Sequence, residues 1–269
     1  MHGQEIVTLR PALRRILAAS PNFRELGGLS AGDRRVRQGV LYRSGALDEL
    51  ECADLAALRG LGIGLCFDLR SQGERQRHPS RWPAGSVPRI LAIEVATDIR
   101  ALDRGTMQYL IDHPDAKGAD RLMRAIYRNM PTSCAPVLRI VFDEVAALGA
   151  REATLIHCTA GKDRTGFVVA MVLQALGVAE ADIQANYLES NYHYDAARDD
   201  AKIASLLEGM FDISLDRVAM QAITAARLEY FQAAYNAIRK DWGSIETYLE
   251  QCCGLSAMRR ARLREALLE

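Results

Sequence analysis

The sequence has no surplus of charge of either sign. Its 269 residues include 34 lysines and arginines against 34 aspartates and glutamates, so the formal net charge at pH 7 is zero. Proteins that coat nucleic acid carry a positive excess, so this balance argues against nucleic acid as a partner, although a local basic pocket is still compatible with it. The 49% of hydrophobic residues is typical of a soluble globular protein, not of a disordered or fibrous one.

Lysine is scarce. Only four of the 34 basic residues are lysines, at positions 117, 162, 202 and 240, which leaves 30 arginines. Background composition would supply arginine at most basic positions. A lysine inside a chemical motif is therefore informative, and Lys162 lies in one.

Metal-ligand spacings are missing as well. The six cysteines form no C-x-x-C pair, and the adjacent Cys252 and Cys253 are poorly placed for chelation or for a disulfide bond. We therefore expect no metal and no cofactor. We also expect a reducing compartment in which most cysteines are small buried hydrophobic residues.

Long apolar runs and a secretory signal are also missing. The charge-free run of residues 165–179 is shorter than the ~20 residues that span a bilayer. Residues 1–5 lack the basic and then apolar pattern of a signal peptide. The sequence predicts no integral membrane segment and a cytoplasmic location, with export by a signal-less secretion route left open.

Strand patterns alternate with helix patterns along most of the chain. No repeat, low-complexity tract or linker interrupts them, so we expect a single domain over residues 1–269. The alternation predicts an α/β fold with a mostly parallel central sheet and helices on both faces. We expect strands within residues 34–44 and over 63–69, 87–93 and 153–156. We expect helices over residues 48–59, 119–131, 134–150, 165–176 and 180–190, and three more after residue 228.

Residues 192–225 have a weaker periodicity and many charged side chains. We expect them to form surface helices. A helical lid over a functional site and a plain helical hairpin fit the pattern about equally well.

The segment with the clearest chemistry is residues 156–166, Ile-His-Cys-Thr-Ala-Gly-Lys-Asp-Arg-Thr-Gly. It follows an expected buried strand and opens a helix, a geometry in which backbone N–H groups and a helix N-terminus converge on an anion. Cys158 starts the loop and Arg164 ends it six positions later, so the chain can curl around one tetrahedral oxyanion while the arginine binds two of its oxygens. The residues expected to bind a substrate phosphate are Thr159, Ala160, Gly161, Lys162, Asp163 and Arg164.

The same placement makes Cys158 a candidate nucleophile. A thiolate at a helix N-terminus and beside Arg164 is stabilised as an anion at neutral pH and can attack phosphorus. Thr165 is expected to donate its hydroxyl to the sulfur, and Gly166 completes the pattern. His157 is expected to point back into the core and to hydrogen-bond the backbone, which would hold the shape of the loop.

Two other interpretations of the loop fit less well. Gly161 and Gly166 have the spacing of a nucleotide-binding loop, but Phe167 stands where that motif needs lysine. A zinc site would need a second ligand pair beyond the adjacent His157 and Cys158.

These residues resemble the signature His-Cys-x5-Arg-[Ser/Thr] of the cysteine-dependent phosphatases. The fuller string Cys-x-x-Gly-Lys-Asp-Arg-Thr-Gly is similar to that of the bacterial tyrosine- and lipid-phosphatase family known as tyrosine phosphatase family 3. Residues 22–28, 41–45 and 67–71 resemble further motifs of that family. Residues 242–249 resemble its C-terminal motif, with Trp242 in place of a tyrosine.

The resemblance implies a phosphatase-type fold and a two-step, metal-free reaction. Cys158 would attack the phosphate of phosphotyrosine, or also of phosphoserine, phosphothreonine or a phosphoinositide, to form a cysteinyl-phosphate. Water would then release inorganic phosphate, while Arg164 and the loop amides stabilise the charge on the phosphate oxygens.

The general acid has two candidates. Many tyrosine phosphatases supply it from a Trp-Pro-Asp motif, but here Ala84 follows Trp82 and Pro83. In the family that the chain resembles, an aspartate inside the loop is the proposed acid, which implies Asp163, unless that carboxylate pairs with an arginine. Asp68, at the end of an expected parallel strand, is the second candidate, although a structural hydrogen bond to loop backbone explains it better.

Lys162 has two possible roles. It could bind a second phosphate on the substrate, as in phosphoinositides, or it could help electrostatically with a single phosphate.

Two alternative functions stay open for such a chain. A binding module of the same fold that holds phosphorylated ligands without turnover is disfavoured by the intact Cys158, Arg164 and Thr165. An arsenate reductase-like enzyme or a sulfur transferase is the other. Arsenate reduction needs a resolving thiol, and Cys66 is the candidate because its expected strand lies beside the one that precedes Cys158.

Overall fold

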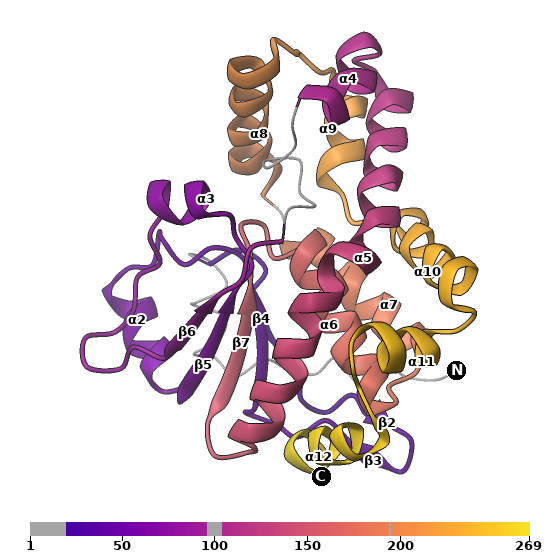
Figure 1. Cartoon of the computed structure of the whole chain (residues 1–269). Coiled ribbons are helices and arrows are strands. Elements are labelled where there is room, and N and C mark those ends of the chain that lie inside the picture. Colours follow the sequence, from indigo (N-terminus) through magenta and orange to yellow (C-terminus); the bar gives the residue numbers. More distant parts are fainter. Residues whose placement is uncertain (1–19, 96–103, 194) are drawn as a thin grey trace, which may run out of the picture.

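A five-stranded sheet lies at the centre of the computed structural model (Figure 1), in the order β1-β4-β7-β5-β6. The structure describes residues 20–95, 104–193 and 195–269. The strands of this sheet are β1 (Arg24–Glu25), β4 (Leu41–Ser44), β5 (Ile63–Asp68), β6 (Arg89–Ala92) and β7 (Ala153–His157). Strands β4, β7, β5 and β6 run parallel, and β1 pairs antiparallel with β4. The predicted mostly parallel sheet is confirmed.

The two faces of the sheet pack against different hydrophobic cores. Successive side chains of a strand point to opposite faces. Leu65 and Phe67 therefore join the larger core, whereas Cys66 between them joins the smaller one. Helices α5 (Ala116–Leu148) and α6 (Asp163–Leu176) supply the larger core, and α2 (Cys52–Arg59) covers the smaller one. Helices thus lie on both faces, as predicted (Figure 1).

The remaining elements surround these layers. A short antiparallel hairpin joins β2 (Ser30–Ala31) and β3 (Arg34–Arg35). The other helices are α3 (Gln72–Arg77), α4 (Arg104–Asp112), α7 (Glu180–Leu188), the 3-10 helix η1 (Glu189–His193), α8 (Ala196–Phe211), α9 (Arg217–Thr224), α10 (Leu228–Trp242), α11 (Ile245–Thr247), the π-helix η2 (Tyr248–Cys252) and α12 (Ala257–Leu267). Within the described ranges, no helix combines the length and the apolar character that crossing a membrane requires.

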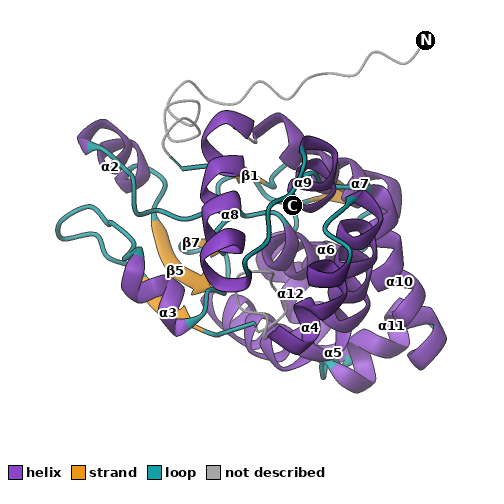
Figure 2. Ribbon diagram, turned by 90° about the horizontal axis from the view of Figure 1, so that it is seen from above, coloured by secondary structure: helices purple, strands orange, loops and turns teal. Residues whose placement is uncertain are grey.

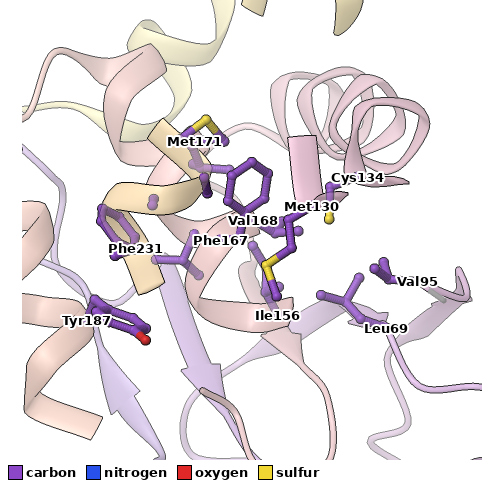
Figure 3. Packing of buried hydrophobic residues seen from close by; sticks show 14 of the residues in the cluster. Leu69, Val95, Met130, Cys134, Ile156, Phe167, Val168, Met171, Tyr187 and Phe231 are labelled. Carbon is purple, nitrogen blue, oxygen red and sulfur yellow. The ribbon is translucent and has the colours of Figure 1, made fainter. Parts of the chain in front are cut away.

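Buried apolar side chains of α6 anchor the chain directly after the loop of residues 158–162. Phe167, Val168 and Met171 are fully buried, and Figure 3 shows them beside Met130 of α5 and Phe231 of α10. Burial of each such large side chain contributes about 1.5–3 kcal/mol. The start of α6, and with it the end of the loop, is therefore held by the core.

Helix α5 corrects one prediction. We expected two separate helices, over residues 119–131 and 134–150. A proline inside a helix usually breaks it, at a cost of about 3 kcal/mol. The structure has one helix of 33 residues with Pro131 and Pro136 inside it. Buried Tyr127, Met130 and Cys134 continue one apolar stripe through the prolines. Tertiary packing of this stripe outweighs the local preference.

The start of α2 corrects another prediction. The helix begins after Glu51, which forms a capping box with Asp54, and not at Asp48. The Asp48 carboxylate lies 2.9 Å from Nδ1 of His78 instead.

The segment 192–225 forms surface helices, as predicted. Helices α8 and α9 lie beyond the carboxyl ends of the parallel strands, on the side where the loop of residues 158–162 lies (Figures 1 and 2). Tyr194 within this segment lies outside the described residues.

Candidate active site

The loop of residues 158–162 joins β7 to α6 at the carboxyl edge of the sheet. Cys158 follows β7 directly and is 1% exposed. Gly161 has a φ of 65°, and a Cβ there would collide with the backbone of Ser44. Only glycine fits this tight curve without strain, so the curve itself depends on the sequence Cys-x-x-Gly.

Groups behind the loop bind its carbonyl oxygens. Asn22 Nδ2 and Arg43 Nη2 donate to the Gly161 carbonyl at 2.6 and 2.7 Å, and the Ala46 N–H donates to the Thr159 carbonyl at 2.9 Å. Because these carbonyl oxygens already accept hydrogen bonds behind the loop, the backbone N–H groups on its other side can face an anion. Burial lowers the pKa of Arg43 to about 10 against the opposing charge of Cys158, so a buried cation stands behind the loop at neutral pH.

Arg164 is fully buried and held by Glu74 of α3. Its Nη1 and Nη2 each donate to a different carboxylate oxygen of Glu74 at 2.8 Å. Thr159 also bonds Glu74 through its hydroxyl. Burial opposes ionisation of Glu74, but the hydrogen bonds and charge of Arg164 hold the pKa of this carboxyl well below its usual range. The fork of Arg164 is thus fixed in one plane.

Sequence reasoning did not identify Glu74 as a site residue. Its signal was present in another sense, since Ser71 and Glu74 form the capping box that starts α3. The pattern predicts the start of a helix. Only the fold shows that the carboxylate of Glu74 also binds Arg164.

Asp163 opens α6 and lines a cavity. Its Oδ1 accepts a hydrogen bond of 2.6 Å from the hydroxyl of Tyr127 and lies 3.4 Å from Nζ of Lys162. Among the described residues, these contacts of Asp163 are with a tyrosine and a lysine, which does not favour the alternative in which it pairs with an arginine. Tyr127, from α5, is a further residue that the sequence pattern did not single out.

Lys162 points to the end of α9. Its ammonium donates to the carbonyls of Ile223 at 2.7 Å and Thr224 at 3.0 Å. The side chain is 6% exposed but still lines the cavity. The lysine therefore connects the loop to a helix of the segment 192–225.

Asp68 is engaged by its neighbours. Arg70 binds both of its carboxylate oxygens, at 2.9 and 2.7 Å, and Nε2 of His157 lies 3.6 Å away. Despite burial, the hydrogen bonds and charge of Arg70 and the nearby His157 lower the pKa of Asp68. Burial lowers the pKa of His157 to about 4, so the imidazole is neutral at pH 7. Its Nδ1 lies 3.3 Å from the Cys158 carbonyl.

Thr165 and Gly166 lie in the first turn of α6. The Thr165 hydroxyl is buried and has no hydrogen-bond partner among the described residues. A Cβ at Gly166 would lie 3.1 Å from the ring of Tyr187, so glycine permits the close packing of α6 against α7.

A cavity of about 580 Å³ lies over the loop. Thr159, Ala160, Lys162 and Asp163 line it from the loop and the start of α6. We refer to its apolar lining residues as the apolar wall: Met123, Ile126, Ile203, Leu206 and Ile223. We refer to a set of its charged or titratable lining residues as the charged rim: Asp48, Glu49, Arg77, His78 and Lys202.

Neither a metal cluster nor a resolving thiol stands out. Residues 20–95, 104–193 and 195–269 contain no group of three or more His, Cys, Asp or Glu side chains that could hold a metal ion. Cys66 pairs in register with Leu155, three residues before Cys158, and its side chain joins the smaller core. Burial raises the pKa of its thiol well above the usual value. This placement does not favour the arsenate reductase alternative.

Together, the sheet, the loop and the N-terminus of α6 define an α/β protein of the phosphatase type, with a loop at the carboxyl edge of a parallel sheet that leads into a helix N-terminus. Comparison with known proteins gives the family. The chain belongs to the tyrosine phosphatase family, whose model matches residues 16–269. The resemblance inferred from the motifs is confirmed.

Individual relatives agree with this assignment. A protein of Cupriavidus necator, provisionally named a tyrosine-protein phosphatase, is 37% identical over 229 residues, or 85% of this chain and 80% of that one. The triple specificity protein phosphatase PtpB of Mycobacterium tuberculosis is 33% identical over 279 aligned positions, which cover 94% of this chain and 99% of PtpB. A tyrosine-protein phosphatase of Nostoc commune is 31% identical over 163 residues, or 60% of this chain and 52% of that protein.

Proposed function

We propose that this phosphatase is a phosphomonoesterase that hydrolyses phosphotyrosine through a cysteinyl-phosphate on Cys158. The observation that carries the proposal is the loop itself, which sets a cysteine at the start of a curve and a fixed Arg164 at its end. The amides of the loop and the N-terminus of α6 favour an anion there.

In the first step the phosphate group binds to the loop amides and to Arg164. Glu74 holds Nη1 and Nη2 of Arg164 in place, and the positive charge of this fixed guanidinium stabilises the phosphate oxygens. The Sγ of Cys158 attacks phosphorus, and the bond between phosphorus and the phenolic oxygen breaks. Asp163 gives its proton to the departing oxygen.

In the second step water attacks the phosphorus of the cysteinyl-phosphate. The carboxylate of Asp163 takes a proton from this water, the S–P bond breaks, and inorganic phosphate leaves. Asp163 and the Cys158 thiolate are then restored. Asp68 is the weaker candidate for the acid, because Arg70 binds both of its oxygens.

The cavity supports an aromatic phosphate ester as the preferred substrate. Its apolar wall from α5, α8 and α9 fits a tyrosine ring, and its charged rim fits peptide backbone. Phosphoserine, phosphothreonine and phosphoinositides are further candidate substrates. A second phosphate near Lys162 would have to replace the bonds to Ile223 and Thr224, so we expect phosphoinositides to be the poorer substrates.

We further propose that α8 and α9 act as a lid over this cavity, within a single domain. Ile203 of α8 and Ile223 of α9 line the cavity from above the loop. Lys202 of α8 bonds Glu49 across the rim at 2.6 Å. A substrate enters when these helices move away. The cytoplasmic location stays a prediction.

Phosphate release is the direct test of this function. Wild-type protein should release phosphate from a phosphotyrosine peptide, and more slowly from phosphoinositides. Vanadate should inhibit, and EDTA should have no effect. Cys158→Ser should abolish turnover while phosphate binding persists, since serine is too weakly acidic to attack but the loop amides are unchanged. Turnover by Cys158→Ser, or activity that EDTA removes and a divalent metal restores, would refute the mechanism.

A further inference from the structure

We propose that Tyr127 is a positioning residue for the general acid. Its hydroxyl fixes Oδ1 of Asp163 and thereby makes Oδ2 the oxygen that carries the transferred proton. This inference rests on the proposed function, in which Asp163 protonates the leaving group.

Three side chains from three helices meet below the cavity. The hydroxyl of Tyr127, on α5, lies 2.6 Å from Oδ1 of Asp163 and 2.7 Å from the hydroxyl of Tyr187, on α7. Both tyrosines are at most 1% exposed. Asp163 is 8% exposed and is the member of the three that lines the cavity. The carboxylate therefore stands between a buried pair of hydroxyls and the space for the substrate.

The donors around Oδ1 decide where the acidic proton sits. The Lys162 ammonium, 3.4 Å from Oδ1, has donors only and cannot accept a proton from Asp163. Burial, with the charge of Asp163, raises the pKa of Tyr127 well above its usual value, so its hydroxyl keeps its proton. Both groups therefore require Oδ1 to be an acceptor. When Asp163 is protonated, the proton belongs on Oδ2, the oxygen left for the leaving group.

Tyr187 sets the direction of the hydrogen bonds that run from Tyr187 through Tyr127 to Asp163. A tyrosine hydroxyl has one proton, so Tyr127 can donate to Asp163 only if Tyr187 donates to Tyr127. Burial raises the pKa of Tyr187 as well, so it has a proton to give. The ring of Tyr187 stacks on that of Phe231, with 4.9 Å between the ring centroids. Both residues are labelled in Figure 3 among the residues of the larger core. Hydrogen bonds in such a chain polarise one another, so each supports the carboxylate form of Asp163 after proton transfer.

Among the described residues, three titratable groups from three different elements interact with Asp163. They are Lys162 from the loop, Tyr127 from α5 and Tyr187 from α7. Tyr127 is the strongest direct contact, at 2.6 Å. Its removal should make the carboxylate less stable and leave Oδ1 to Lys162 alone.

The test compares Tyr127→Phe with wild type on two substrates. On a phosphotyrosine peptide, whose leaving group needs a proton, kcat should fall about tenfold, a part of the ~10²–10⁴ that general acid catalysis contributes. On an activated aryl phosphate, whose leaving group needs no proton, kcat should change less than about twofold. The alkaline limb of the kcat profile should move to higher pH, because a carboxylate that has lost a hydrogen-bond donor is less stabilised.

Tyr248→Phe is the matched control. Tyr248 is also buried, and within the described residues its hydroxyl donates to the Pro131 carbonyl of the same helix, 2.7 Å away, and not to Asp163. We expect a loss of thermal stability of the same kind and no dependence of kcat on the leaving group. Tyr187→Phe should give a smaller effect than Tyr127→Phe in the same direction.

Equal losses of kcat on the two substrates, or a pH profile identical to that of wild type, would overturn the proposal. Its failure is distinguishable from failure of the proposed function. If wild-type protein does not hydrolyse phosphotyrosine, or if Asp163→Asn loses equally on both substrates, the function or the identity of the acid is wrong. If both of those tests succeed and Tyr127→Phe behaves like Tyr248→Phe, the positioning role alone is wrong.

Discussion

The loop of residues 158–162 and the helices α8 and α9 are held in different ways. Asn22, Arg43 and Ala46 bond the loop carbonyls, and Glu74 holds both Nη atoms of Arg164, in a largely buried environment. Helix α8 is fastened at the cavity rim by the ion pair of Lys202 with Glu49, whose side chains are 56% and 48% exposed. An exposed pair of this kind contributes about 0–1 kcal/mol.

The difference fits the two tasks. Groups that stabilise a developing charge must be oriented before the substrate arrives, so the loop is over-determined by hydrogen bonds. If α8 is the proposed lid, it must open at small cost, and the exposed pair with Glu49 adds little to that cost. The larger part comes from Leu207 and Phe211 of α8, which are buried in the larger core. Lys162 belongs to both regions, because it lies in the loop and bonds the end of α9.

The largest effect on activity is expected for Asp163, which lies next to the loop in the fixed region. Asp163→Asn should slow hydrolysis of a phosphotyrosine peptide by about 10²–10⁴, because asparagine cannot protonate the leaving group. An activated aryl phosphate should be hydrolysed at nearly the wild-type rate. Steady-state kinetics on both substrates measure this. An equal loss on both would show that Asp163 maintains the loop instead, and Asp68→Asn would then be the next variant to measure.

His157 should make the stability of the fixed region depend on pH. Its pKa is about 4 in the folded protein and 6.5 in an unfolded chain, so the unfolded state takes up the proton first as the pH falls. The free energy of unfolding should therefore drop between pH 6.5 and pH 4, by about 3 kcal/mol from this residue. Denaturant unfolding of wild type and His157→Gln measures the slope. An equally steep slope in the variant would contradict the assignment.

Glu74→Gln should loosen Arg164 without removing it. We expect kcat/KM for a phosphotyrosine peptide to fall about tenfold, since a charged hydrogen bond contributes about 1.5–3 kcal/mol and the amide keeps part of it. Glu144→Gln, which breaks the exposed pair of Glu144 with Arg89, is the control and should leave kinetics unchanged. Wild-type kcat/KM in Glu74→Gln would show that Arg164 needs no such partner.

Lys202→Ala should have the smallest effect, because it removes only the exposed fastening of the lid. We expect Tm to change by no more than a surface ion pair allows, and KM to change less than about fivefold. The association rate of vanadate, measured by stopped flow, should increase if opening limits entry. A slower association would show that Lys202 guides the anion and does not restrain α8.

The parts of the site that could be predicted depend on residues close together in the sequence. The loop from Cys158 to Arg164 lies within a single turn of chain between a buried strand and a helix, so its residue types suffice to infer its geometry. Glu74 and Tyr127 reach the loop only through the pairing of β5 with β7 and the packing of α5, and no local pattern reports such contacts.

Other contacts also explain why two predictions about the helices were wrong. From local sequence patterns we expected a break in α5 after Pro131 and a start of α2 at Asp48. The buried stripe of α5 and the capping box of Glu51 outweighed them. The second-phosphate role of Lys162 could not be judged from the sequence either, because the carbonyls of Ile223 and Thr224 lie some 60 positions further along the chain.

The proposed mechanism requires a covalent phosphoryl intermediate on Cys158 in the fixed loop. Rapid acid quench of wild-type protein during turnover of a phosphotyrosine peptide, followed by digestion and mass spectrometry, tests it directly. We expect one added phosphoryl group on the peptide that contains Cys158, and none in Cys158→Ser. A phosphoryl group on another residue, or steady turnover by Cys158→Ser, would contradict it.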